Sequence, residues 1–162
     1  MAILILVTLG TQDKRFERLI KQVEDCVKNK TINEEVIVQA GYTEYQSKYL
    51  KIIDYVSHSD FEKYINDCSL LITHGGVGSI MNGLNKNKKV IVCPRLSKYK
   101  EHTNDHQLDI VNEFAKQGYI IPLNENDSLD DALKLAKKFK TKKITSNTNN
   151  FIKILEKFIE NN

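Results

Sequence analysis

Short apolar runs recur along the chain, and the stretches between them mix apolar and polar residues. Runs that are apolar at nearly every position are typical of strands buried on both faces, as in a parallel sheet covered by helices. The strands that we expect lie at residues 3–7, 36–38, 52–56, 70–73, 90–93 and 119–121. The run at 52–56 is the weakest of them, and Pro122 ends the last one.

Helical spacing separates most of these runs. Apolar residues three and four positions apart, from Phe16 to Val27, predict a helix that begins at about Asp13. A short helix through residue 66 has Ser59 or Asp60 as its expected cap. Further helices are expected at residues 80–85, 105–116 and 129–139. Strands that alternate with helices in this way predict an α/β fold, a Rossmann-like doubly wound parallel sheet.

The C-terminal part of the chain has a different pattern. We expect one domain over residues 1–140 and, over 141–162, a polar linker followed by an amphipathic helix at 151–159. One face of that helix would be an apolar stripe of Phe, Ile and Leu, with Lys and Glu opposite. The stripe is consistent with packing on the helix's own sheet and with docking to a partner chain.

Composition excludes several classes of protein. Hydrophobic residues make up 41% and charged residues 28% of the 162 residues, which is ordinary for a soluble globular domain. The net charge of +3 comes from 21 lysines but only three arginines, and a nucleic-acid reader usually relies on arginine, so we expect no nucleic-acid partner. The three cysteines have no metal-ligand spacing, which predicts reduced thiols and no metal site. The apolar residues 2–7 fall far short of the roughly 20 needed for a membrane span.

The strongest chemical signal is a glycine-rich turn between an expected strand and an expected helix. It contains His74, Gly75, Gly76, Gly78 and Ser79. Glycines let a backbone approach an anion closely, and the free N–H groups at a helix start then face that anion. The histidine ring and the serine hydroxyl add two further donors. The pattern favours phosphate binding, and the alternative is a tight turn that uses glycine for packing.

Two more polar segments follow the ends of expected strands. Gly10 and Thr11 form the turn after the first strand, and this strand and the one ending at residue 73 would flank the point where the strand order reverses. Ligands of open α/β sheets bind at that point. Residues 104–107 are polar at a helix start, where His106 and Gln107 suit sugar hydroxyls. The alternatives are a plain connecting turn and a helix-capping cluster.

Taken together, these motifs resemble those of one enzyme family. Segments 7–11, 73–79 and 104–108 resemble, in order and spacing, the nucleotide-sugar-binding half of GT-B glycosyltransferases, over residues 3 to about 121. More narrowly, the chain resembles the small catalytic subunits of split family 28 enzymes. These include the dolichol-linked N-acetylglucosaminyltransferase and bacterial capsule and exopolysaccharide transferases. The resemblance implies a domain equivalent to the C-terminal half of a GT-B enzyme.

The resemblance also implies roles for individual residues. The diphosphate of a UDP-sugar would contact the glycine turn at His74, Gly76, Gly78 and Ser79, and would be covered by Gly10 and Thr11. His106 and Gln107 would address the sugar hydroxyls. Asn82 stands where relatives often carry a carboxylate for the ribose, so that contact is weakened. The general base commonly comes from the other domain, and His58 and Asp13 are the local candidates.

A function follows as an expectation from this resemblance. The chain would be a UDP-sugar-dependent, inverting glycosyltransferase subunit that needs no metal or other cofactor. It would transfer a hexose to a lipid-diphosphate-linked sugar in capsule or exopolysaccharide synthesis. A membrane-anchored, acceptor-binding subunit would hold it in the cytoplasm at the inner face of the membrane. The alternative is a donor-binding module that supports catalysis by the partner, and a nucleotide-sugar 2-epimerase is disfavoured because that fold needs two domains.

Overall fold

The computed structural model describes residues 4–144 and residue 156. Within these residues, six strands form one parallel sheet in the order β3-β2-β1-β4-β5-β6. The strands are β1 (Leu4–Thr8), β2 (Glu35–Gln39), β3 (Lys51–Ile53), β4 (Cys68–His74), β5 (Lys89–Cys93) and β6 (Ile121–Pro122). The helices are α1 (Glu17–Lys28), α2 (His58–Asp67), α3 (Val77–Asn85), α4 (His106–Lys116) and α5 (Leu129–Lys138), with a 3-10 turn η1 at Ser97–Tyr99.

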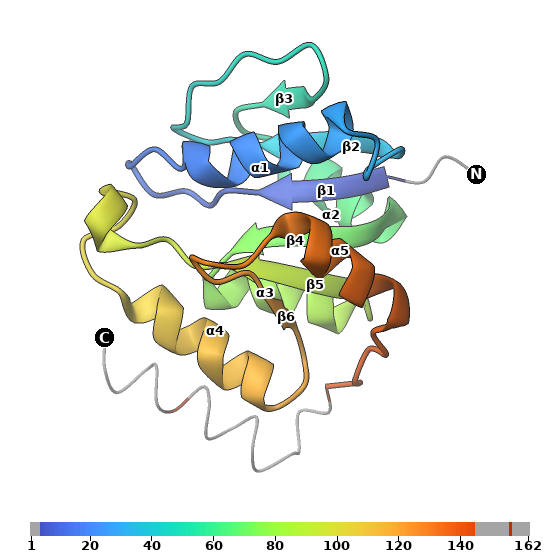
Figure 1. Cartoon of the computed structure of the whole chain (residues 1–162), viewed down its shortest axis with the longest axis vertical. Coiled ribbons are helices and arrows are strands. Elements are labelled where there is room, and N and C mark those ends of the chain that lie inside the picture. The colour runs from blue at the N-terminus through green and yellow to red at the C-terminus, as the bar shows by residue number, and fades with distance from the viewer. Residues whose placement is uncertain (1–3, 145–155, 157–162) are drawn as a thin grey trace.

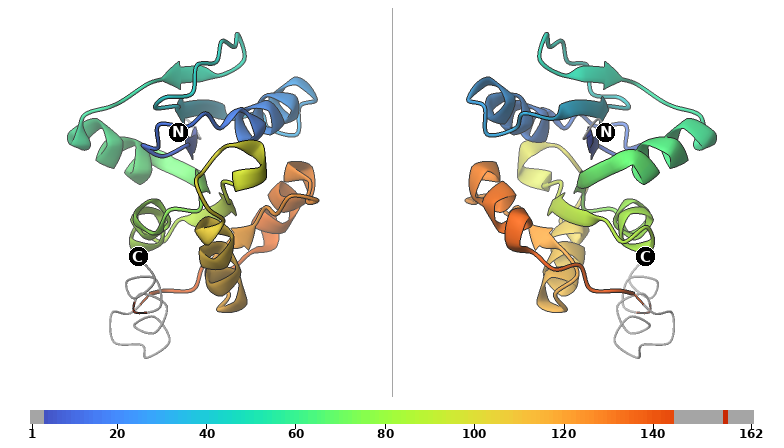
Figure 2. Two further views of the ribbon diagram at one scale, coloured as in Figure 1. Left: turned by 90° about the vertical axis from the view of Figure 1, so that its left-hand side faces the viewer. Right: turned by 90° about the vertical axis from the view of Figure 1, so that its right-hand side faces the viewer.

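Helices cover both faces of this sheet. Helices α1 and α5 lie on one side of it, and α2 and α3 lie on the other (Figures 1 and 2). The strands supply alternate residues to two apolar cores: Ile5 and Val7 of β1 join the core under α1 and α5, whereas Leu4 and Leu6 join the core on the opposite face. Both faces being buried explains why the strands are apolar at consecutive positions, and the expected doubly wound fold is confirmed.

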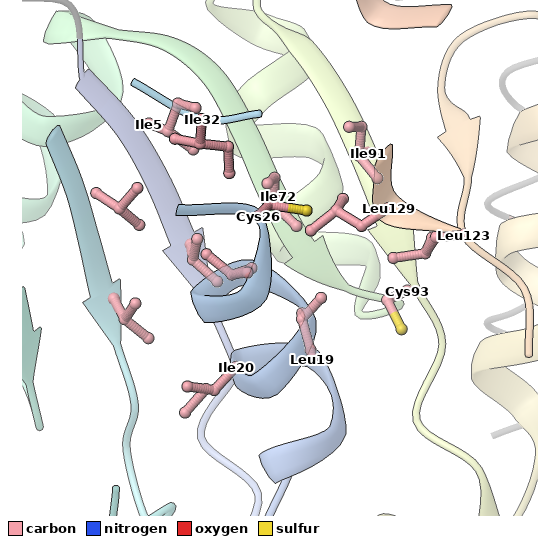
Figure 3. Close-up of a cluster of buried hydrophobic side chains, with 14 of the residues drawn as sticks. Ile5, Leu19, Ile20, Cys26, Ile32, Ile72, Ile91, Cys93, Leu123 and Leu129 are labelled. Carbon is pink, nitrogen blue, oxygen red and sulfur yellow. The ribbon is translucent and has the colours of Figure 1, made fainter. Parts of the chain in front are cut away.

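The core under α1 is dense and aliphatic. Figure 3 shows Leu19 and Ile20 of α1 in one cluster with the strand residues Ile72 and Ile91 and with Leu129 of α5. All five side chains are at most 2% exposed. The cysteines Cys26, Cys68 and Cys93 are buried free thiols, which agrees with the expected reduced state.

The strand order reverses between β1 and β4, as the sequence predicted. Strand β1 lies between β2 and β4, so the chain runs outward in one direction from β1 to β3 and in the other from β4 to β6. Thr8, the last residue of β1, is paired in register with Gln39 of β2 and Thr73 of β4. The carboxyl ends of the three strands are therefore level, and a ligand site is expected there.

Several element boundaries differ from the prediction. Helix α1 begins at Glu17 rather than at about Asp13, because the amide of Phe16 donates to the Thr43 hydroxyl (2.9 Å) and Phe16 has a non-helical backbone. The cap of α2 is Ser57, whose hydroxyl accepts from the amide of residue 60, and not Ser59 or Asp60.

The two outermost strands also differ. Strand β3 ends at Ile53, so Tyr55 and Val56 belong to the loop that follows it. Strand β6 begins later than predicted, because Tyr119 instead donates its amide to Phe114 at the end of α4 (3.1 Å). Strand β6 includes Pro122, which an edge strand accommodates because one side of it needs no ladder donor. The expected helix at 151–159 lies outside the described residues.

Candidate functional site

A cleft of about 440 Å³ opens at the carboxyl ends of β1 and β4, at the point where the strand order reverses. Residues of both glycine-containing turns line it: Gly10 and Thr11 after β1, and His74, Gly76, Gly78 and Ser79 at the junction of β4 and α3. Sequence reasoning placed these two turns on one ligand, and the structure brings them together across the cleft.

His74 is the buried centre of this cleft. Its side chain lies between the two turns, because a Cβ atom built on Gly10 would be 2.6 Å from His74 Nε2 and one built on Gly76 would be 2.4 Å from His74 Cε1. No side chain fits at those distances. Gly10 also has a φ of +86°, which only glycine adopts readily. The space that the His74 ring occupies therefore explains why positions 10 and 76 are both glycine.

Gln107 supports this arrangement from below the turn. Its Oε1 accepts the amide protons of Gly75 (2.9 Å) and Arg95 (3.0 Å), and its Nε2 lies 3.2 Å from His74 Nδ1. On the other side of the ring, His74 Nε2 lies 3.1 Å from the hydroxyl oxygen of Ser79. The amide, the imidazole and the hydroxyl therefore form one chain of hydrogen bonds that ends in the cleft.

His74 is uncharged at neutral pH. Its pKa is lowered to about 4, chiefly by burial and next by the positive charge of Arg95. A neutral imidazole keeps one N–H donor and one acceptor nitrogen. The site can therefore donate a hydrogen bond to an anion without bringing an imidazolium charge to it.

The first turn of α3 adds backbone donors. Gly76 is the N-cap of this helix and, being glycine, makes no side-chain bond to the amides of the first turn. These amides carry the positive end of the helix dipole, so they favour an anion in the cleft. Gly78 has open space around it, since no atom lies within 4 Å of a Cβ built there. A ligand can therefore approach the backbone of this turn closely.

One side of the cleft is aromatic and apolar. Tyr55, Val56 and Phe61 line it, from the loop after β3 and from α2. Tyr55 is 56% exposed and packs edge-on against Tyr42, with 6.2 Å between the ring centroids. An exposed aromatic face of this kind suits the stacking of a planar ring. The prediction from sequence assigned no role to these residues, because it treated 52–56 as a strand.

Arg95 is a functional residue that sequence reasoning missed. The side chain is 1% exposed, and its guanidinium donates to the carbonyl oxygens of Leu9, Lys14 (2.9 Å) and Glu101 (2.9 Å). It thereby joins the turn that carries Gly10 to the loop after β5. The planar guanidinium has five N–H donors in a rigid fork, which suits three carbonyl oxygens that lie in different directions. A usable signal was present: Arg95 is one of three arginines among 24 cationic residues and directly follows a strand end.

A buried ion pair extends the same network. Arg18 of α1 makes two hydrogen bonds to the carboxylate of Glu101, at 2.9 and 3.0 Å, and a third to the carbonyl of Pro94. Glu101 is 3% exposed and also accepts the amide proton of Leu96. The loop after β5 is therefore fixed relative to α1, and Arg95 transmits that rigidity to the first glycine turn.

The remaining candidate residues lie in different places. Gly75 and Gln107 are buried beneath the cleft, and a Cβ on Gly75 would be 2.8 Å from Gln107 Cβ. Gln107 is therefore placed to support the turn, not at the cleft surface where a sugar hydroxyl was expected to meet it. His106 and Asn82 are exposed and are not among the residues that line the cleft.

The two candidates for a general base separate in the same way. His58, the first residue of α2, is exposed and lines the cleft. Asp13 is exposed in the loop before α1 and is not among the lining residues. His58 is thus the better placed of the two.

Segment 104–107 caps its helix, one of the alternatives left open above. The side-chain oxygen of Asn104 accepts the amide proton of His106 (3.0 Å), and Asp105 accepts that of Ser97 (2.8 Å). Asp105 also lines a second cavity, of about 430 Å³, between the loops after β5 and β6. Three of the four polar side chains therefore serve separate places, with Asn104 at the helix start, Asp105 at the second cavity and Gln107 under the glycine turn, and the side chain of His106 is exposed.

The described residues contain neither a metal-binding cluster nor a membrane-spanning helix. Among residues 4–144 and 156, no group of three or more His, Cys, Asp or Glu side chains could hold a metal ion. No helix among them is long and apolar enough to cross a bilayer.

Comparison with known proteins gives a family match over nearly the whole chain. The glycosyltransferase family 28 C-terminal domain matches residues 4–161. Among curated proteins, the chain is 32% identical over 81 residues to the UDP-N-acetylglucosamine transferase subunit ALG13 of Candida albicans, covering 50% of this chain and 26% of that protein. It is 36% identical over 72 residues to the Saccharomyces cerevisiae protein of the same name, covering 44% and 34%. The chain thus matches a quarter to a third of the length of these relatives.

Solved structures share the fold. The solution structure of ALG13 superposes with a TM-score of 0.63 at 21% identity, covering 94% of both chains. The glycotransferase of kitacinnamycin gives 0.62 at 16% identity, covering 85% of this chain and 34% of that one. The UDP-GlcNAc 2-epimerase of Methanocaldococcus jannaschii, solved with UDP-GlcNAc and UDP, gives 0.58 at 15% identity, covering 98% and 46%. The fold of this chain therefore corresponds to nearly the whole of the ALG13 structure and to less than half of each of the other two chains.

Proposed function

Because the chain belongs to glycosyltransferase family 28, whose C-terminal domain it matches over residues 4–161, we propose that it is the donor-binding subunit of a UDP-sugar-dependent glycosyltransferase. The donor that we favour is UDP-N-acetylglucosamine, since two curated relatives are named as N-acetylglucosamine transferase subunits. The cleft between the two glycine turns is the proposed donor site.

The observation that carries this proposal is the set of donors that converge on the cleft. The uncapped first turn of α3 supplies backbone amides, and the hydroxyl of Ser79, which is hydrogen-bonded to His74, supplies a side-chain donor on the same wall. Hydrogen bonds to a charged group contribute about 1.5–3 kcal/mol each, so three or four of them would hold a diphosphate firmly. No cation is required, because the helix dipole adds its positive end at the same point.

The shape of the cleft accommodates the rest of a UDP-sugar. With the diphosphate at α3, the aromatic side formed by Tyr55, Val56 and Phe61 is placed to receive the uracil ring. Gln39 also lines the cleft and offers a side-chain amide to the ribose. Asn82 is exposed outside it, so in this proposal the ribose has no acidic partner at that position.

The proposed reaction is a single displacement with inversion. An acceptor hydroxyl oxygen attacks the anomeric carbon while the bond from that carbon to the diphosphate oxygen breaks. UDP leaves with the bonding electron pair, and the donors at α3 stabilise the negative charge that develops on it. The proton of the acceptor hydroxyl passes to a general base. His58 is the candidate within the cleft, and a second polypeptide or domain facing the cleft is the other source.

We further propose that the acceptor is a sugar linked to a lipid diphosphate. A membrane-anchored partner would present it at the cytoplasmic face of the membrane. The described residues form a single sheet whose cleft is open at the carboxyl edge, which is where such a partner would close it. Capsule or exopolysaccharide synthesis remains a context of this proposal. The names of the curated relatives favour N-acetylglucosamine transfer instead of a hexose without the acetamido group.

A second candidate function is a donor-binding module without a catalytic group of its own. The residues that line the cleft favour it. They include two histidines, and because His74 is buried and hydrogen-bonded on both sides, His58 is the histidine left to act as a base. In that case the base belongs to the partner, and His58→Gln leaves turnover unchanged. If His58 is the base, the same variant loses most of its turnover but keeps its affinity for the donor.

The proposal is tested by titrating the full chain with UDP-N-acetylglucosamine and following backbone amide signals by NMR. We expect saturable shifts at residues of the α3 turn, and binding weakened about tenfold in Ser79→Ala through loss of one hydrogen bond. An exposed serine, Ser59, gives the matched control Ser59→Ala. Shifts confined to other regions, or equal affinity in Ser79→Ala and the control, would overturn the assignment of the site.

A further inference from the structure

The buried amide of Gln107 can face only one way. Its Oε1 lies 2.9 Å from the amide nitrogen of Gly75 and 3.0 Å from that of Arg95, and both of these groups are donors. An amide oxygen can accept from two N–H groups, whereas an amide nitrogen there would set donor against donor twice. The orientation of the side chain is therefore fixed by its two backbone partners. Its NH₂ group must then point at His74.

This orientation determines where His74 carries its proton. The Gln107 Nε2 lies 3.2 Å from His74 Nδ1, and an amide nitrogen only donates. Nδ1 must accept, so the single proton of the neutral ring is on Nε2. That nitrogen is 3.1 Å from Ser79 Oγ, to which it donates. The hydroxyl proton of Ser79 is then free to turn into the cleft that Ser79 lines.

We infer that Gln107 is a positioning residue that holds His74 in the Nε2–H tautomer, so that a relay of neutral hydrogen bonds ends in a Ser79 hydroxyl aimed at the ligand. Bonds in such a chain polarise one another and strengthen the last donor. The tautomer follows from the contacts alone. The consequence for ligand binding rests on the proposed function. If the cleft binds a UDP-sugar, the hydrogen-bond donors that meet the diphosphate are uncharged.

The surroundings of His74 keep this relay neutral. Gly10 and Gly76 enclose the ring and carry no charge. The charged or titratable groups that act on it are Arg95 and His102, and each of them lowers the pKa of His74, as burial does, whereas the hydrogen bond with Gln107 raises it by less than burial lowers it. A diphosphate that is esterified at both ends has no group that titrates near neutral pH. His74 should therefore add no pH dependence to the affinity for a UDP-sugar between pH 5.5 and 8, and the other histidine that lines the cleft is His58.

A purely structural role for Gln107 makes a different prediction. Accepting the amide protons of Gly75 and Arg95 needs only an oxygen, which glutamate provides equally well. The substitution Gln107→Glu keeps that function but removes the donor to His74 Nδ1. The second carboxylate oxygen would instead attract a proton to Nδ1, because it can only accept. The variant therefore separates the positioning role from the packing role.

The first test reads the tautomer directly, in the full chain without ligand. Long-range proton–nitrogen NMR distinguishes a protonated imidazole nitrogen from an unprotonated one. We expect His74 to show a protonated Nε2 and an unprotonated Nδ1 from pH 5.5 to 8, in the native protein and in Ser79→Ala. In Gln107→Glu we expect Nδ1 to be protonated. The exposed Gln46→Glu makes the same chemical change on the surface and should leave the His74 signals unchanged.

Two outcomes would overturn the inference. One is a protonated Nδ1 in the native protein at pH 7, and the other is a change of tautomer in Ser79→Ala, which would make Ser79 the controlling group. Both measurements remain decisive if Gln107→Glu fails to fold.

The second test measures binding of UDP-N-acetylglucosamine by calorimetry at pH 5.5 and pH 8. The protein with Gln107 and the Gln107→Glu variant are both measured in a His58→Gln background, which removes the exposed histidine of the cleft wall, and there we expect the affinity of the protein with Gln107 to change less than twofold between these values. In Gln107→Glu it should be about tenfold weaker at pH 8 and should recover at pH 5.5, where the added imidazolium proton restores a donor at Nε2. Affinity of the variant that does not depend on pH would contradict the relay. Absence of binding by the native protein would refute the proposed function and leave the tautomer measurement standing.

Discussion

Replacing Gly76 with alanine should damage the donor site while leaving the fold intact. The backbone of Gly76, at φ −77° and ψ 133°, suits any residue, so the substitution causes no backbone strain. The new Cβ, however, would lie 2.4 Å from His74 Cε1, more than 1 Å closer than ordinary carbon contacts of about 3.5 Å. The ring cannot retreat freely, because the turn at Gly10 lies against it and Gln107 binds its Nδ1.

The size of the effect follows from these contacts. Overpacking of a tight site costs about 1–3 kcal/mol, which for a chain of this length lowers the melting temperature by about 2–4 °C per kcal/mol. Displacing the ring also breaks its hydrogen bond to Ser79 and disturbs the donor set. One lost hydrogen bond to a charged group is worth about 1.5–3 kcal/mol, so binding should weaken roughly 10- to 100-fold.

Thermal melting and calorimetry with UDP-N-acetylglucosamine measure the two effects separately. Gly78→Ala is the matched control for stability, because it adds the same methyl group two residues away, where no atom lies within 4 Å. Its melting temperature should not fall, since alanine favours a helix by about 0.5–1 kcal/mol over glycine. Unchanged affinity and unchanged His74 signals in Gly76→Ala would refute the reasoning that the glycine exists to admit the ring.

Three further outcomes follow from buried groups. Arg95→Lys should lower the free energy of unfolding in urea by about 2–4 kcal/mol through lost carbonyl bonds, whereas Arg15→Lys, at the surface, should lower it by less than about 1 kcal/mol. Burial holds the pKa of His74 at about 4, so between about pH 6.5 and 4 only the unfolded chain takes up its proton. The free energy of unfolding should fall by roughly 3 kcal/mol over that range, a component that His74→Gln removes. Burial raises the pKa of Cys26 and Cys93 to about 12, so at pH 8 neither should react with a thiol reagent until the chain is denatured, and fast labelling of the folded protein would contradict this.

The arrangement of the fold was accessible from sequence because it rests on local patterns. Each strand with both faces covered is apolar at consecutive positions, and the chain then turns at glycine, as after β1 and β4. The two turns could be assigned to one site from topology alone, since parallel strands on either side of the reversal end at the same edge. The same topology predicts that Gly10 and His74 lie close together, as they do in the structure.

The details that were missed depend on partners distant in sequence. Helix α1 starts late partly because the guanidinium of Arg95 holds the carbonyl of Lys14, 81 residues away. Gln107 was expected at a sugar, but its amide binds Gly75, 32 residues away, and the histidine beside it. The sequence pattern of a polar residue at a helix start is the same whether its side chain faces a cleft or the underside of a turn. Only the packing of the two loops distinguishes these cases.

The central claim is that the first turn of α3 binds the diphosphate of a nucleotide sugar, and a structure of the chain with UDP-N-acetylglucosamine tests it most directly. The account predicts phosphate oxygens within hydrogen-bond distance of the amides at Val77 and Gly78 and of the Ser79 hydroxyl, with uracil near Tyr55. A ligand seated in the second cavity beside Asp105, or a diphosphate that makes no contact with this turn, would contradict it.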